Sequence, residues 1–291
     1  MNWSSNVGLS LGAAAAGLSA LAPVAPAGAA EIASYYVGVD DMPAFTSGAY
    51  SGLPNPNYNR LTILYAHPST ESPASSHYHS KATRIYTGPN LGASTAQAWS
   101  ASDYLPEGTI PPVRLATGTG VYAGKLASAP YADPDDPGYH FSFFEVRSTQ
   151  SLATAAAGTP AQYLFNSSGG RWDAAMAGAD VHLVLVSLTP GLNVGTPTAL
   201  TSGLNGPGDE LHLGEPDASM SFTPTFWTDG AAAPGVYEAK FRLVDEGGAF
   251  GDSGEFRVLV SVPEPGALAG IGLAGATLMT RRVRRRSAGR A

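Results

Sequence analysis

Apolar and polar residues alternate along several segments of the chain, with the period of two that is typical of a β-strand buried on one face. The clearest segment spans 235–246 and reads GVYEAKFRLVDE. This segment is expected to form a strand at the surface of a core. Its predicted buried face carries Tyr237, Ala239, Phe241 and Leu243, and its predicted exposed face carries Glu238, Lys240 and Arg242.

Similar runs recur along the chain between clusters of Gly, Pro, Asn and Asp, and their spacing predicts an all-β protein of the β-sandwich type with mostly antiparallel strands. Two further segments, 94–105 and 171–178, are expected to form short helices, but they do not give the strand–helix alternation of a parallel sheet. Because no long linker divides the chain, we expect one domain over 31–262. The predicted strands cover 60–67, 139–147, 180–188, 221–227 and 255–262.

The composition agrees with this fold class and limits the chemistry. Only 13% of the residues are charged, whereas 35 glycines and 23 prolines favour short strands joined by turns. The chain has no cysteine, which excludes disulfides, thiolate metal sites and cysteine nucleophiles. A metal ion would therefore have to be held by nitrogen and oxygen atoms.

The two ends of the chain differ from the rest. Residues 1–30 carry no charged side chain and end in an Ala-rich stretch, a pattern that predicts a secretory signal peptide cleaved before Glu31. Near the other end, a Pro-Glu-Pro motif precedes an apolar run over 267–280 and a group of arginines. The apolar run is short for a stable membrane span of about 20 residues, and the arginines would stop transfer. The motif consists of Pro263, Glu264 and Pro265.

This C-terminal segment, 263–291, resembles the PEP-CTERM sorting signal of exported bacterial proteins in its three parts and their order. The resemblance implies that an exosortase removes the tail, after signal peptidase has removed the leader and the tail has anchored the chain transiently in the membrane. It implies a mature protein in the periplasm, on the outer surface or in the extracellular matrix.

The predicted mature body is anionic. The tail holds six of the 16 basic residues and one of the 23 acidic ones, which leaves 10 basic against 22 acidic side chains over 31–262, a net charge of −12. Such a surface repels nucleic acid and attracts cations, so we expect no nucleic-acid partner.

Three of the six histidines fall within residues 65–80, YAHPSTESPASSHYHS. In an extended segment, His77 and His79 would present their imidazoles on one face about 7 Å apart, and His67 lies at the end of a predicted strand. Two imidazoles on one face can converge on a single ion, so the three residues are candidate metal ligands. The alternative is three solvated histidines beside a Ser/Pro loop.

His212 is the candidate fourth ligand, because acidic residues that could bind the ion or orient the imidazole surround it in the sequence. These neighbours are Asp209, Glu210, Glu215 and Asp217. Imidazole and carboxylate together suit zinc, although copper or nickel would also bind such a site.

The other two histidines are weaker candidates. His140 follows an acidic loop, and this loop could instead hold calcium, although it lacks the spacing of an EF-hand. His182 stands among alternating apolar residues and is expected to be structural. The acidic residues of the loop are Asp133, Asp135 and Asp136.

Catalytic motifs are sparse. The sequence GDSGE at 251–255 is similar to the nucleophile segment of trypsin-like proteases but is expected to form a turn between strands. The chain has no H-E-x-x-H helix, P-loop or G-x-S-x-G elbow. We therefore expect no enzymatic activity, with a zinc hydrolase as a remote alternative.

Two stretches around the histidines, YYVGVDDMPAFTSGAYSGLPNPNYNRLTILYAH and HYHSKATRIYTGPN, look like a family of PEP-CTERM proteins repressed by the zinc-uptake regulator. This resemblance implies expression when zinc is scarce, and hence binding or scavenging of zinc outside the cytoplasm. The leading hypothesis is an exported, envelope-associated zinc-binding protein. The alternative is a structural or adhesive surface protein of the biofilm matrix without a dedicated metal.

Overall fold

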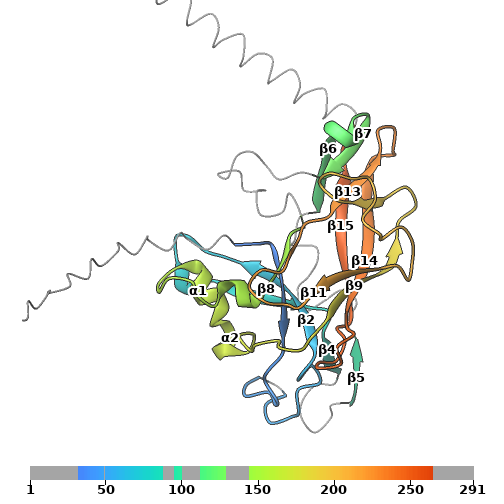
Figure 1. Ribbon diagram of the computed structural model, residues 1–291. Helices are drawn as coiled ribbons and strands as arrows, with labels where there is room; N and C mark the ends of the chain where they lie inside the picture. Colours follow the sequence, from blue (N-terminus) through green and yellow to red (C-terminus); the bar gives the residue numbers. More distant parts are fainter. Residues whose placement is uncertain (1–31, 49, 88–94, 100–111, 129–143, 265–291) are drawn as a thin grey trace, which may run out of the picture.

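The computed structural model describes residues 32–48, 50–87, 95–99, 112–128 and 144–264 of the 291-residue chain. Strands dominate these residues and the helices are short, which confirms the predicted all-β class (Figure 1). The strands form a five-stranded sheet, an eight-stranded sheet and a two-stranded ribbon, and one of the two large sheets curls into a half-barrel. Neighbouring strands are largely antiparallel, as predicted, and the parallel pairs are β1 with β8 and β15 with β6.

The five-stranded sheet has side chains alternating between an inner and an outer face, because successive residues of a strand point to opposite sides. Its inner face carries Tyr35 and Tyr65, and its outer face carries Tyr36 and Tyr78, which pack against short helices. The strand order is β12 (Ser221–Phe222), β8 (Val146–Ser148), β1 (Tyr35–Val39), β2 (Leu61–His67) and β3 (His77–Lys81). The helices are η6 (Thr149–Leu152), α1 (Pro160–Phe165) and α2 (Ser167–Gly170).

The eight-stranded sheet contains the strand with the clearest alternation. In β14 the alternating residues Ala239, Phe241 and Leu243 are buried, as the pattern predicts. The strand order is β10 (Asn193–Gly195), β13 (Thr225–Asp229), β7 (Lys125–Ser128), β6 (Val113–Thr117), β15 (Glu255–Val262), β14 (Gly235–Asp245), β9 (Val181–Leu188) and β11 (Glu210–Gly214). The ribbon consists of β4 (Arg84–Thr87) and β5 (Thr95–Trp99). A short helix, η4 (Gly120–Tyr122), precedes β7.

The two large sheets share one apolar core, in which Phe144 is completely buried. Its ring centroid lies 4.6 Å from that of Tyr35 on the five-stranded sheet. It also lies 6.2 Å from the ring of Phe226 and 6.3 Å from the ring of Phe241 on the eight-stranded sheet. Aromatic contacts at these distances add to the burial energy, so Phe144 joins the two layers.

Three predictions of local structure were wrong. Residues 95–99 form strand β5 where a helix was expected, and 171–178 contain no helix. The helices lie before 171–178 in the sequence. Helix α1 begins at Pro160, and the Thr159 side chain caps it by accepting a hydrogen bond from Gln162 N. The segment 221–227 is divided between β12 and β13, which belong to different sheets, because Pro224 between them has no N–H for a strand ladder.

The predicted signal peptide and most of the predicted sorting signal lie outside the described residues, so these stay predictions. Among the residues that the structure does describe, no helix is long and apolar enough to cross a membrane.

Candidate metal centre

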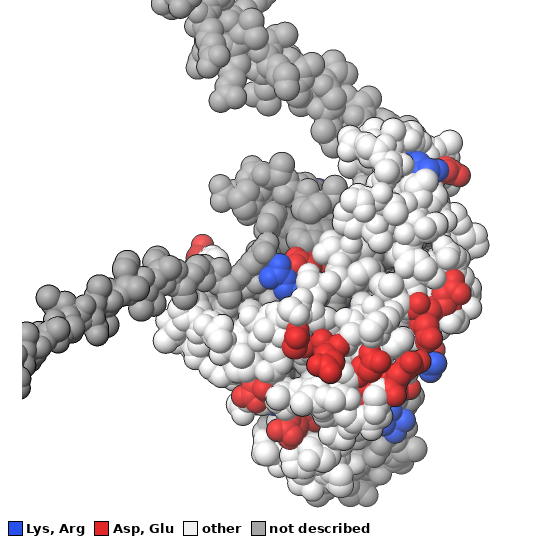
Figure 2. Space-filling view, viewed as in Figure 1, with Lys and Arg blue, Asp and Glu red and all other residues white. Residues whose placement is uncertain are grey.

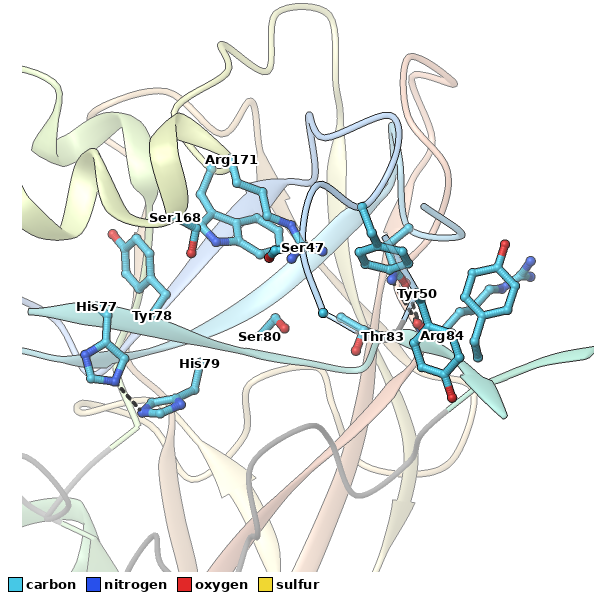
Figure 3. A pocket seen from close by; sticks show the side chains of 15 residues that line it. Ser47, Tyr50, His77, Tyr78, His79, Ser80, Thr83, Arg84, Ser168 and Arg171 are labelled. Carbon is cyan, nitrogen blue, oxygen red and sulfur yellow. Dashed lines mark hydrogen bonds between the residues drawn. The ribbon is translucent and has the colours of Figure 1, made fainter. Parts of the chain in front are cut away.

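The β2–β3 hairpin brings three of the predicted ligands together. In its antiparallel register, His67 pairs directly with His77, and Tyr65 pairs with His79. Because residues of a strand two positions apart share a face, all three imidazoles lie on the same side of the hairpin. Figure 3 shows His77 and His79 on one side of β3 and Tyr78 on the other. We call these residues, His67, His77 and His79, the hairpin site.

The ring nitrogens of the hairpin site converge. His79 Nε2 lies 3.3 Å from His67 Nδ1 and 3.1 Å from His77 Nε2. One ligand atom from each residue lies within 4.8 Å of the others, which is close enough to share an ion. The expected i, i+2 pair is therefore present, and the cross-strand partner His67 completes a group of three.

The loop between the two strands orients one of these rings. His77 Nδ1 lies 2.7 Å from the Ser75 carbonyl oxygen, which can only accept a hydrogen bond. Nδ1 therefore carries the proton, and the lone pair of neutral His77 is on Nε2, which faces the other two imidazoles. Ser75 ends the short helix η1 (Pro73–Ser75), and Ser76 Oγ accepts a hydrogen bond from Ser69 N across the loop. The Ser/Pro loop is thus a fixed support for the ligand.

Burial and mutual repulsion favour the neutral form of His67 and His79. Desolvation, followed by the charges of His77 and His67, lowers the pKa of His79 to about 4. Desolvation and the charge of His77 also lower the pKa of His67. Protons therefore compete weakly with a cation for these nitrogens at neutral pH.

A cavity of about 710 Å³ adjoins the hairpin site (Figure 3). His77 and His79 form part of its lining, together with Tyr50, Trp172 and Arg171. The Arg171 guanidinium lies over the Trp172 ring at 4.6 Å and binds the buried Asp40 carboxylate, with Arg171 Nε 2.8 Å from Asp40 Oδ1. This ion pair fixes the wall of the cavity on the Tyr78 side of β3, opposite the side that carries the imidazole rings.

His212, the predicted fourth ligand, lies elsewhere. It is on β11 of the eight-stranded sheet and groups with Asp180 and His182, and not with the hairpin site. Of its acidic sequence neighbours, Glu210 belongs to an adjoining group with His182, whereas Asp209 accepts hydrogen bonds from a local turn. Asp217 likewise accepts hydrogen bonds from Ser219.

His182 was expected to be structural, hydrogen-bonded or at the strand surface, but its acidic neighbours Asp180 and Glu246 were not predicted. The missed signal was Asp180, which precedes His182 by two residues and shares its face by the same rule that pairs His77 with His79. The remaining candidates, His140 and the three aspartates of the calcium alternative, lie outside the described residues.

No protein-family model matches the chain, and comparisons with curated proteins and with solved structures found no match.

Proposed function

We propose that this protein is an exported, envelope-associated metal-binding protein whose hairpin site binds zinc when zinc is scarce. The observation that carries the proposal is the convergence of His67 Nδ1, His77 Nε2 and His79 Nε2. Nitrogens bound to one tetrahedral zinc at 2.0–2.1 Å are about 3.3 Å apart. The separations of 3.1 and 3.3 Å are close to this value, so an ion would require little movement of the rings.

The protonation of the site supports this proposal. With its Nδ1 proton donated to Ser75, neutral His77 offers the Nε2 lone pair to His79 Nε2 at 3.1 Å, and a cation at this point would replace that hydrogen bond. The Ser75 carbonyl holds the His77 ring as a second-sphere acceptor, an arrangement found around metal-bound histidines. Three protein ligands leave one coordination position, which water or a further donor would fill.

The choice of zinc and the location outside the cytoplasm rest on the sequence. Imidazole nitrogen suits zinc, and the resemblance around 35–90 implies expression under zinc limitation. The signal-like leader and the Pro-Glu-Pro tail support export, processing by signal peptidase and exosortase, and transient anchoring in the membrane. The anionic body favours the approach of cations.

Competition for Zn²⁺ between the full chain and a chromophoric chelator tests the proposal. The wild-type chain should remove zinc from the chelator, and His79→Ala should weaken binding at least about tenfold. X-ray absorption of the zinc-loaded chain should show three imidazole ligands. Asp229→Asn is the matched control, because it removes an exposed charge on β13, in the other large sheet, and should leave zinc binding unchanged.

The same experiment distinguishes the metal-binding proposal from the alternative of a structural or adhesive surface protein. That alternative predicts that the His67→Ala/His77→Ala/His79→Ala variant competes with the chelator as well as the wild type does. Equal competition would overturn the proposed function.

A further inference from the structure

A second group of potential ligands lies at the edge of the eight-stranded sheet, around a cross-strand histidine pair. His182 of β9 pairs directly with His212 of the edge strand β11, and their ring centroids are 4.9 Å apart. Asp180 precedes β9, and Glu246 follows β14 on the other side of His182. The strands thus bring residues from three distant parts of the sequence to one place.

Carboxylate oxygens surround the two imidazoles. Asp180 Oδ1 is 2.7 Å from His212 Nε2 and 3.9 Å from His182 Nε2. Glu246 Oε2 is 3.5 Å from His182 Nε2, and Glu210 belongs to the same neighbourhood. Figure 2 shows that acidic side chains predominate on the face over β9 and β14. The group therefore combines two nitrogen ligands with an excess of anionic oxygen.

A buried carboxylate holds the backbone of this region in place. Asp245 Oδ1 accepts hydrogen bonds from Asp180 N at 2.7 Å and from Gly247 N at 3.0 Å. Asp245 Oδ2 accepts a third from Phe250 N at 2.7 Å, and Glu246 N donates to the Asp180 carbonyl at 2.9 Å. These hydrogen bonds hold the backbone at Asp180 and Glu246 in place, so both carboxylate side chains extend toward the histidines from fixed positions.

We propose that Asp180, His182 and His212, with Glu246 or Glu210 as a further ligand, form a second divalent-metal site that is independent of the hairpin site. An ion between these residues would replace two separate histidine–carboxylate contacts by one centre. It would also cross-link the edge strand β11 to β9 and to the turn after β14. The second site contains none of the three histidines of the hairpin site, so the two sites can be tested independently.

The second site should bind zinc more weakly than the hairpin site. His182 Nδ1 is buried and has no hydrogen-bond partner among the described residues. A metal bound to Nε2 places the proton on Nδ1, where it would remain unsatisfied, and such a group is costly to bury. His77 avoids this cost, because its Nδ1 donates to the Ser75 carbonyl.

The ligand types should also give the two sites different ion preferences. Carboxylate oxygen suits Mn²⁺ in addition to Zn²⁺, whereas imidazole favours the later transition metals. The second site is thus expected to accept Mn²⁺, and the hairpin site, with three imidazoles, is expected to discriminate against it.

The test titrates the full chain carrying His67→Ala/His77→Ala/His79→Ala, so that only the second site remains. Calorimetry with Zn²⁺ should show one bound ion, and adding Asp180→Asn should weaken its binding at least about tenfold. Asparagine can still accept the hydrogen bond from His212, so a purely structural contact would survive this change. Asp229→Asn, which removes a charge from an 83% exposed side chain on β13, is the matched control.

A second readout does not depend on the variants. Mn²⁺ added to the wild-type chain should broaden the imidazole NMR signals of His182 and His212 before those of His77 and His79. Equal Zn²⁺ affinity in the Asp180→Asn and Asp229→Asn chains, or broadening that spares His182 and His212, would overturn the second site. Neither result would affect the hairpin site, which His182→Ala/His212→Ala leaves intact for the chelator competition.

Discussion

His67 and His77 lie directly opposite each other across the β2–β3 hairpin. Directly paired residues have Cβ atoms about 4.5–5.5 Å apart, which suits two imidazoles that share an ion. His79, two residues further along β3, approaches both rings. The metal proposal depends on this register, because a slip of one residue would turn the β3 histidines to the other face.

Zinc should stabilise the folded protein. A ligand that binds only the native state at 100 times its dissociation constant adds about 2.7 kcal/mol. In a domain of this size that corresponds to a rise in Tm of about 5–10 °C. Thermal unfolding of the full chain with and without Zn²⁺ measures the shift. The rise should be largely lost in His77→Ala, and a full rise in that variant would contradict the assignment.

The stability of the ion-free protein should depend on pH through the hairpin site. The pKa of His79 is about 4 in the folded protein, below its value of about 6.5 in an unfolded chain. Between these values the unfolded chain binds more protons, so stability is complete above about pH 6.5 and decreases as the pH falls towards 4. Denaturant unfolding between pH 7 and 4.5 measures this decrease.

The matched variant for the pH experiment is His79→Gln, which has no imidazole to titrate and should show a flatter dependence. NMR titration of the wild-type imidazoles gives a direct check. A midpoint for His79 near 6.5 would show that its ring is not desolvated as the structure indicates.

Arg171→Ala should destabilise the protein without weakening metal binding. It would leave the Asp40 carboxylate, which is completely buried, without its guanidinium partner, and breaking a buried pair in this way costs about 3–5 kcal/mol. The exposed pair of Lys125 and Asp229 supplies the comparison, because Asp229→Asn should cost less than about 1 kcal/mol. Urea unfolding measures both changes, and equal effects would argue against a structural role for Asp40.

Phe144→Ala should test the core between the sheets. Deletion of a buried Phe ring generally costs about 3–5 kcal/mol, and Phe144 contacts aromatic rings of both layers. Val121→Ala, at a side chain that is 50% exposed, should change stability by less than about 0.5 kcal/mol. Comparable effects of the two substitutions in urea unfolding would show that Phe144 does not join the sheets.

The strands with strict alternation were predictable, because burial of one face imposes a period that is visible in the sequence. The predicted strand 255–262 has the same bounds as β15. On the predicted buried face of 235–246, Ala239, Phe241 and Leu243 are buried, whereas Tyr237 is only partly buried. The helix beginning at Pro160 was missed although Thr159 and Pro160 form a recognisable start. It is short, and tertiary packing supplies most of the stability of so short a helix.

For the candidate sites too, the sequence predicts contacts within one strand but not contacts between distant strands. The i, i+2 relation of His77 and His79 is local and could be deduced from two residues alone. The pairing of His182 with His212 joins positions 30 residues apart through a strand register that no local pattern specifies. His212 was consequently grouped with the histidines of the hairpin, while Asp180 and His182, which the structure places beside it, were overlooked.

The hairpin site has a consequence for the order of assembly. Its three ligands span only 13 residues of chain, from His67 to His79, and belong to one hairpin. A hairpin closes within about 1–10 μs, much faster than sheets joined by distant strands. The hairpin can therefore capture an ion before the distant strands have paired, and the captured ion would then favour the β2–β3 register around which the five-stranded sheet is completed.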